Sequence, residues 1–105
     1  MNPYEIYIAY ISWGVNGKYR PILFIEEDGG YAMAFRVTSQ YANKSDDIKA
    51  QYIEITDWQH AGLSKLSYID AGEKVKIALA LISPNLPIGK LSEADKQRLL
   101  EFLEK

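Results

Sequence analysis

The stretch RPILFIEEDGGYAMAFRVTSQ, residues 20–40, decides the fold of this chain. Arg20–Glu27 is rich in Ile, Leu and Phe and predicts a strand, with Pro21 near its start, where a missing N–H is tolerated. Asp28-Gly29-Gly30 predicts a tight hairpin into a second strand over Tyr31–Val37. The polar Thr38-Ser39-Gln40 follows directly. We therefore expect a central antiparallel hairpin with polar groups at one end.

Residues 31–38 alternate in character, which assigns the two faces of the second strand. We expect one face to hold Tyr31, Met33, Phe35 and Val37, and the other to hold Ala32, Ala34, Arg36 and Thr38. Further strands are predicted over Tyr4–Ser12, Gln51–Thr56, Ser67–Asp70 and Lys74–Ile82. Loops are predicted over Trp13–Lys18, which contains an Asn-Gly turn signal, and over Gln40–Lys49.

Helix signals are concentrated near the C-terminus. Ser92 begins a capping-box-like sequence that predicts a helix over Glu93–Glu104. An apolar stripe is expected to lie on the sheet, formed by Leu91, Ala94, Leu99, Phe102 and Leu103. A single helical turn is predicted over Asp57–Gly62, and Asp70-Ala71-Gly72 is expected to be a turn. The predicted class is mainly β with α.

Length and composition bound the rest. The 105 residues fit one domain, residues 1–105, and a hydrophobic content of 48% can fill a core. The absence of Cys excludes disulfides and thiolate chemistry and suits a reducing cytoplasm. The first residues lack a basic segment leading into an apolar one, and no apolar run approaches the roughly 20 residues that span a bilayer. We expect a cytoplasmic protein without membrane contact.

The net charge of −2, from 12 basic and 14 acidic residues, lacks the basic footprint usual for nucleic-acid binding. Residues 57–91 nevertheless hold Lys65, Lys74, Lys76 and Lys90 against Asp57, Asp70 and Glu73, so a local basic groove is compatible with the sequence. Most tyrosines lie in predicted strands, where β propensity explains them. Tyr19 and Tyr41 are the two candidates for stacking single-stranded bases.

Arg20 and Thr38 each stand at the end of an apolar strand, where a rigid backbone can direct both at one phosphate. A guanidinium makes two parallel hydrogen bonds to a phosphate, and the hydroxyls of Thr38 and Ser39 can hold a phosphate oxygen. Taken singly, each feature is common: an exposed Arg beside a turn, and a Thr-Ser pair leaving a strand. Their combination indicates a metal-free phosphodiester site.

The remaining titratable groups restrict the mechanism. His60 is the only histidine, so a two-histidine ribonuclease mechanism is excluded within one chain, and we interpret His60 as a surface residue. With no Cys and no clustered carboxylates, neither a metal site nor a cofactor is expected. Asp70 or Glu73 can serve as a general base if folding brings it near Arg20.

In this order, the features resemble the MazF/PemK family of type II toxin–antitoxin ribonucleases. The matching pattern is Arg20-Pro21 before an apolar strand, Val37-Thr38-Ser39-Gln40 at the end of the next one, an extended Tyr52–Ile55, a Ser67-containing strand, and Ile88-Gly89-Lys90-Leu91-Ser92 before the last helix. The resemblance covers nearly the whole chain.

The resemblance implies a small SH3-like antiparallel β-barrel of the CcdB/PemK type with a C-terminal helix, working as a homodimer. It implies a sequence-specific, metal-independent endoribonuclease that cleaves single-stranded RNA, often mRNA, through attack by the ribose 2′-OH. It also implies a cognate antitoxin protein. DNA is then contacted only indirectly, through the complex with this antitoxin. Arg20 and Thr38 match the family's catalytic residues. Substrate contacts are expected from Lys18, Tyr19, Ser39, Gln40, Ser67 and Lys76.

The chain departs from common members of this family in two places. Its loop between the first two strands is short, and Glu73-Lys74-Val75-Lys76 has Lys where relatives carry Arg. Lys is the poorer bidentate phosphate ligand.

Two alternative functions stay open. CcdB-type toxins share the fold and poison DNA gyrase without cutting RNA, and a fold does not determine function. A Trp at the end of the C-terminal helix would have favoured such a gyrase contact, but Phe102-Leu103-Glu104-Lys105 contains none. The second alternative is a degenerate toxin that retains only antitoxin binding, which the acidic net charge supports.

Overall fold

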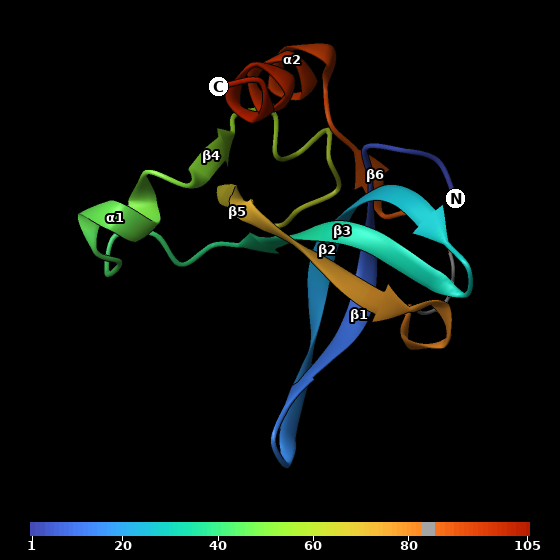
Figure 1. Cartoon of the computed structure of the whole chain (residues 1–105). Helices are drawn as coiled ribbons and strands as arrows, with labels where there is room; N and C mark the ends of the chain where they lie inside the picture. The colour runs from blue at the N-terminus through green and yellow to red at the C-terminus, as the bar shows by residue number, and fades with distance from the viewer. Residues whose placement is uncertain (83–85) are drawn as a thin grey trace.

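A six-stranded antiparallel sheet, curled into a half-barrel, forms the body of the molecule, and a helix covers one end of it (Figure 1). The computed structural model describes residues 1–82 and 86–105. The strand order is β4-β5-β3-β2-β1-β6. The elements are β1 (Glu5–Trp13), β2 (Asn16–Asp28), β3 (Tyr31–Thr38), α1 (Asp46–Lys49), β4 (Tyr52–Ile55), β5 (Ser67–Ala78), the 3₁₀ turn η1 (Leu79–Leu81), β6 (Gly89–Lys90) and α2 (Glu93–Leu103). The expected mainly β class with a C-terminal helix is confirmed.

The central β2–β3 hairpin forms where it was predicted, but β2 begins at Asn16 and not at Arg20, because residues 16–19 pair with β1, so Arg20 lies inside the strand. Gly29, at φ +58°, and Gly30 close the turn, and the register places Ile22 directly opposite Arg36. Ile25 is an extra residue in β2, because the register shifts between Phe24 and Glu26. Such a bulge increases the local twist of a strand. The hairpin therefore starts the curl of the sheet.

Each face of the sheet packs into its own apolar core. The first core includes Ile6, Leu23, Phe35, Val37, Ile55, Ile69 and Leu99. The second core lies on the opposite face and contains Tyr7, Ala9, Ile22, Phe24, Ala32, Ala34, Ile77 and Ile82. Successive residues of a strand point to opposite faces. This explains why the N-terminal strand is apolar on both faces.

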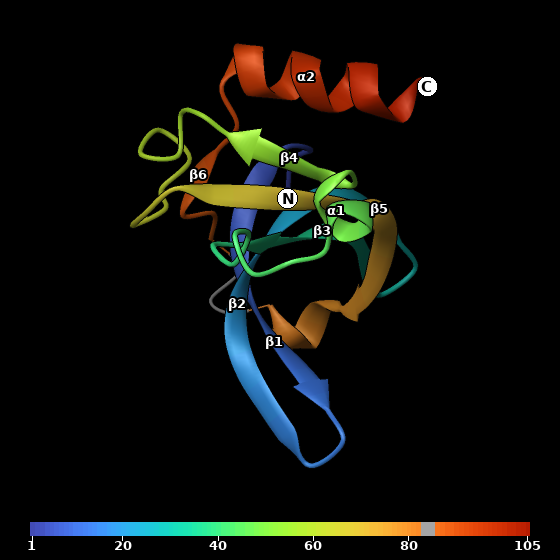
Figure 2. The same ribbon diagram turned by 90° about the vertical axis from the view of Figure 1, so that its left-hand side faces the viewer.

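The predicted loop over Trp13–Lys18 is wrong, because the connection between β1 and β2 is shorter. Trp13 pairs with Asn16, so Gly14 and Val15 alone form the turn. Gly14 takes the positive φ, +59°, that such a turn requires. The Asn16-Gly17 pair begins β2 instead of forming the turn. The resulting long hairpin projects from the rest of the molecule (Figures 1 and 2).

β5 is one bent strand where two strands and a turn at Asp70-Ala71-Gly72 were predicted. The Ala71 N–H donates to the carbonyl of Gln51 at 2.9 Å, so this segment stays extended beside the start of β4. Opposite β3, the pairing passes from Val75–Ala34 to Asp70–Arg36, which leaves residues 71–74 facing Phe35 alone. The four residues bend β5 around the sheet (Figure 2). The strand also ends at Ala78, before η1, and not at Ile82.

The predicted loop over Gln40–Lys49 contains α1, where the Ser45 hydroxyl caps the helix by accepting the Ile48 N–H at 3.4 Å. The turn at Asp57–Gly62 is confirmed: the Ala61 N–H donates to the Asp57 carbonyl at 3.1 Å, and Gly62 has φ +82°. A Cβ on Gly62 would lie 2.0 Å from the carbonyl oxygen of Ile88, so only glycine allows this approach to the chain before β6.

α2 begins at the predicted cap, where the Ser92 hydroxyl accepts the Asp95 N–H at 3.2 Å. The predicted apolar stripe is wrong in two positions, because Ala94 and Leu103 are exposed while Asp95 is fully buried. α2 runs above β4 (Figure 2) and buries Leu99 in the first core. No helix of the described residues is long and apolar enough to cross a bilayer.

Asp95 is the buried polar group that joins α2 to the end of β4. Its Oδ1 accepts the Thr56 N–H at 3.2 Å, the Thr56 hydroxyl at 2.8 Å and the Arg98 guanidinium at 2.5 Å. Its Oδ2 accepts the Asp57 N–H at 2.9 Å, and Arg98 also donates to the Glu54 carbonyl. Burial by itself raises the pKa of Asp95, but the bonds from Asp57, Arg98 and Thr56 outweigh it and hold the pKa below its ordinary 3.8.

We expect Asp95→Ala to lower the free energy of unfolding by about 3–5 kcal/mol, because it leaves Arg98 and the N–H groups of Thr56 and Asp57 without their buried acceptor. Urea denaturation measures this. Glu93→Ala is the matched control, since Glu93 is exposed and lies 3.9 Å from Lys96 in a solvated ion pair. Equal unfolding free energies for the two variants would contradict a structural role for Asp95.

The Asp95 carboxylate should also make the free energy of unfolding depend on pH in the acid range. The folded pKa of Asp95 is lowered, so its stabilising contribution is complete above the ordinary pKa of 3.8 and is lost as the pH falls through the folded pKa. Asp95→Asn cannot titrate at this position, so its unfolding free energy should fall less steeply below pH 4 than that of the wild type. Parallel curves for the two proteins, from urea denaturation at several pH values, would contradict this.

Candidate functional site

One face of the sheet changes from apolar to polar at the edge of the second core. On β3, Ala32 and Ala34 are buried in that core, and the exposed Arg36 and the half-buried Thr38 continue the same face beyond it. On β2, Ile22 belongs to the same core, and Arg20 lies two residues before it on the same face. Cations and a hydroxyl thus gather where the apolar packing ends.

The register brings Arg20 and Thr38 together. Ile22 pairs with Arg36, and two residues further along each antiparallel strand lie Arg20 and Thr38. Both line the same two open hollows, a first hollow of about 200 Å³ and a second hollow of about 160 Å³. The first hollow also contains Arg36, Gln40, Lys44, Tyr52 and Asp70, and the second also contains Ser39, Ser64, Lys65 and Ser67.

The Thr38 hydroxyl is held in a fixed orientation. Its Oγ1 accepts the Gln40 N–H at 3.0 Å. A hydroxyl has one donor hydrogen in addition to its lone pairs, so Thr38 can donate to a group in the hollow without giving up this bond. Ser67 differs: its buried hydroxyl donates to the Lys65 carbonyl at 3.0 Å, which orders the chain beside the second hollow.

Asp70 reaches the site through the bend in β5. It pairs with Arg36 on one side and with Tyr52 on the other, and directly opposite residues of antiparallel strands have Cβ atoms about 4.5–5.5 Å apart. Its Oδ1 accepts the Gly72 N–H at 3.4 Å. Of the two candidate bases, Asp70 thus lines a hollow with Arg20, whereas Glu73 lies on the bend and does not line the first or second hollow.

An aromatic cluster borders the first hollow. The Tyr41 ring stacks on Tyr68 with centroids 4.2 Å apart, and its centroid lies 6.1 Å from that of Tyr52. The Lys49 ammonium lies 5.1 Å from the Tyr41 ring centroid. Burial raises the pKa of the Tyr68 phenol, and the nearby Glu54 raises it further. Tyr41 therefore anchors the chain that follows Thr38 to β4 and β5.

Tyr52 can act as a hydrogen-bond donor in the first hollow. Burial raises the pKa of its phenol, the Asp70 carboxylate raises it further, and the Arg36 guanidinium opposes both. The net shift is upward, so the phenol stays protonated at neutral pH.

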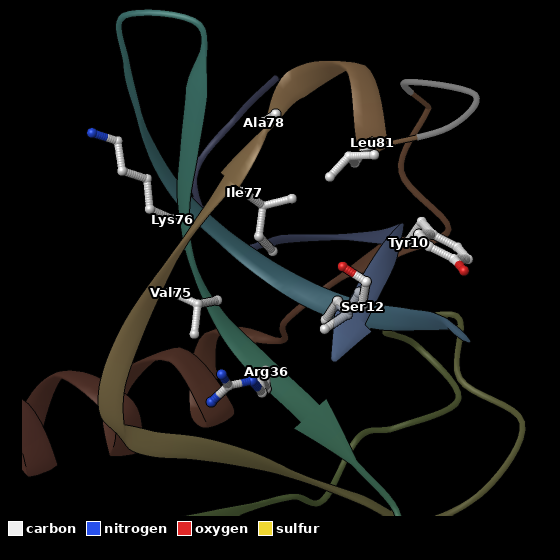
Figure 3. A pocket seen from close by; sticks show the side chains of 9 residues that line it. Tyr10, Ser12, Arg36, Val75, Lys76, Ile77, Ala78 and Leu81 are labelled. Carbon is white, nitrogen blue, oxygen red and sulfur yellow. The ribbon is translucent and has the colours of Figure 1, made fainter. Parts of the chain in front are cut away.

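Three of the predicted substrate contacts, like Glu73, lie outside the first two hollows. Lys18 and Tyr19 are on the projecting hairpin, where Tyr19 is 67% exposed and its ring meets Tyr10 edge-on at 5.2 Å. Lys76 lines a third hollow, but its ammonium points away from it and lies 4.6 Å from the Tyr31 ring centroid (Figure 3).

His60 lines a different hollow together with Tyr4 and Lys96. This hollow shares no lining residue with the first and second hollows. No group of three His, Asp or Glu side chains able to hold a metal ion occurs in the described part of the chain.

Sequence reasoning gave no role to Arg36 or Lys44, and it named Lys65 only as one of the lysines of a local basic groove. Arg36 shares its strand face with Thr38, so the alternation of β3 was a signal that could have identified it. Lys44 lies in the segment after Thr38, and its approach to the site depends on the turn closed by the Lys44 N–H and the Tyr41 carbonyl, which bond at 2.9 Å. No sequence pattern predicts that approach.

The chain matches no protein-family model, and no curated protein is significantly similar to it.

Tyr41→Ala should loosen the segment after Thr38. The lost stacking is worth about 0.5–1.5 kcal/mol, which corresponds to roughly 2- to 10-fold more frequent local opening. Limited proteolysis with trypsin should therefore cut after Lys44 and Lys49 faster than in the wild type. Tyr41→Phe keeps the ring and serves as the control. Equal cleavage rates for all three proteins would refute the anchoring role.

Proposed function

We propose that this protein is a metal-independent endoribonuclease that cleaves single-stranded RNA, of the kind found as toxins in type II toxin–antitoxin systems. The observation that supports this best is the convergence of Arg20, Thr38 and Asp70 on one open hollow. These three side chains come from three different strands, and together they supply a phosphate-binding cation, a directed hydroxyl and a carboxylate.

The chemistry follows from these groups. The ribose 2′ oxygen attacks the adjacent phosphorus while Asp70 accepts the proton of the 2′-OH. The bond from phosphorus to the 5′ oxygen breaks, and a proton from Arg20 or from water reaches the departing oxygen. The products are a 2′,3′-cyclic phosphate and a free 5′-OH. Negative charge develops on the nonbridging oxygens, which Arg20 and the Thr38 hydroxyl bind more tightly in the transition state than in the substrate.

The finer fold assignment belongs to the same proposal: the curled sheet with its C-terminal helix is an SH3-like barrel of the CcdB/PemK type. The projecting hairpin exposes Tyr19 and the whole of Val15, and such apolar surface supports a homodimer. Arg20, Arg36, Lys44 and Lys65 would bind carboxylates as well as phosphates. This supports an antitoxin partner with an acidic segment that covers the site.

Arg20→Ala and Thr38→Ala should each lower the rate of RNA cleavage by about 10²–10³, because each removes a contact made to developing charge. Thr38→Ser keeps the hydroxyl and should retain most of the activity. Single-turnover cleavage of a long single-stranded RNA measures the rates. His60→Ala is the control, since His60 lies in a separate hollow.

The circular dichroism spectra of these variants should match the wild type, since Arg20 and Thr38 lie outside both cores. Wild-type cleavage by Arg20→Ala at equal protein concentration would overturn the assignment. An intact wild type that cuts no RNA would favour a binding module on the same fold, either a gyrase poison or a degenerate toxin.

Cleavage should persist in EDTA and leave 2′,3′-cyclic phosphate ends, because the proposed nucleophile is the ribose 2′-OH and the charge is bound by Arg20. Phosphatase alone removes linear 3′-phosphates, whereas a cyclic phosphate must first be opened by acid, so 3′-end-labelling after phosphatase with and without prior acid distinguishes the two kinds of end. Activity that returns only with Mg²⁺ or Mn²⁺ would indicate a different mechanism.

A further inference from the structure

The third hollow lies beside the proposed catalytic groups and is not explained by them. It has a volume of about 250 Å³ and is formed by β1, β3, β5 and η1. Ile77 and Leu81 form an apolar wall, the Ser12 hydroxyl points into the opening, and Arg36 stands at one end (Figure 3). The hollow therefore offers an apolar surface, a hydroxyl and a cation to one occupant.

Arg36 connects this hollow to the proposed active site. It lines both the third hollow and the first hollow, where it lies with Arg20 and Thr38. Its side chain is exposed and, among the described residues, forms no hydrogen bond or ion pair. A guanidinium in this position can bind a phosphate bidentately, and it lies where a strand passing between the two hollows would place one.

We propose that the third hollow is a subsite for a nucleotide that flanks the scissile phosphate, with the base against Ile77 and Leu81 and the phosphate on Arg36. This inference rests on the proposed ribonuclease function and names residues that would select its substrate. The Ser12 hydroxyl can donate to or accept from an edge of the base, which gives the subsite a means of base preference.

The composition of the hollow favours a nucleotide over an apolar peptide side chain. A purely apolar occupant would remove the Arg36 guanidinium from water and supply no acceptor of its own, which is costly. A nucleotide supplies an apolar base face and an anionic phosphate together. The cation also continues the series of Lys65, Arg20 and Lys44 along the second and first hollows. One extended RNA strand can contact all of these groups.

The test begins by mapping where the wild type cuts a long single-stranded RNA in EDTA. A short RNA around that position is then made with 2′-deoxyribose at the attacking nucleotide, which prevents cleavage, and its binding is measured by fluorescence anisotropy. The variants are Arg36→Ala, Arg36→Lys and Ser12→Trp, which is designed to fill the hollow with an indole, since Ser12 lines it and is exposed. Lys96→Ala is the control, because it removes one positive charge from an unrelated hollow.

Arg36→Ala should weaken binding about 10- to 100-fold, as expected for loss of a charged hydrogen bond, while Arg36→Lys should weaken it less and Lys96→Ala hardly at all. An abasic site at one flanking nucleotide should weaken wild-type binding by roughly 10-fold. In Ser12→Trp, which still contains Arg36, the intact and abasic RNAs should bind equally.

The subsite is refuted if the wild type binds and cuts RNA but Arg36→Ala binds it as tightly as the wild type does. It is also refuted if no flanking abasic site distinguishes the wild type from Ser12→Trp. A wild type that neither cuts nor binds single-stranded RNA would refute the proposed function and the subsite together, so the two failures are distinguishable.

Discussion

The register between β2 and β3 is the constraint on which the rest of the structure depends. With Ile22 opposite Arg36, Leu23 and Phe35 enter the first core while Phe24 and Ala34 enter the second. A slip of one residue would move every side chain of a strand to the other face. Arg36 would then enter a core without a partner for its charge, which is strongly unfavourable. Apolar packing on both faces therefore positions the polar groups beyond it.

The bend in β5 is the second constraint, and it follows from the presence of two cores. Ile69 belongs to the first core and Ile77 to the second, although an even number of positions separates them. A regular strand would keep both on one face. Residues 71–74 have no partner on β3, and this lets β5 change the face that it turns toward each core. Within this segment, the N–H of Ala71 donates to the carbonyl of Gln51 instead. The same bend places Asp70 between Arg36 and Tyr52, so the carboxylate reaches the site because of core packing.

Local sequence patterns were sufficient for the elements whose signals lie within the element itself. Alternation assigned the faces of β3, glycines marked its turn, and Ser92 marked the start of α2. The failures involve partners distant in sequence. The sequence placed Asp95 only in the capping-box-like start of the helix, because its bonds to Thr56 depend on where α2 lies over β4. At the site, Thr38 lies at the strand end where it was predicted, whereas Arg20 lies inside β2, and no sequence signal predicted the approach of Lys44.

The acidic net charge of −2 is compatible with an RNA-cleaving site, because the charge that matters is local. Among the described residues, Arg20, Arg36, Lys44 and Lys65 line the first and second hollows together with one carboxylate, that of Asp70. A protein that neutralises only a few phosphates gains little nonspecific affinity for nucleic acid and shows a shallow dependence of affinity on salt. Binding must then come from directed contacts to a few nucleotides. If the proposed ribonuclease function holds, such a surface favours selection of a short single-stranded sequence over broad association with RNA.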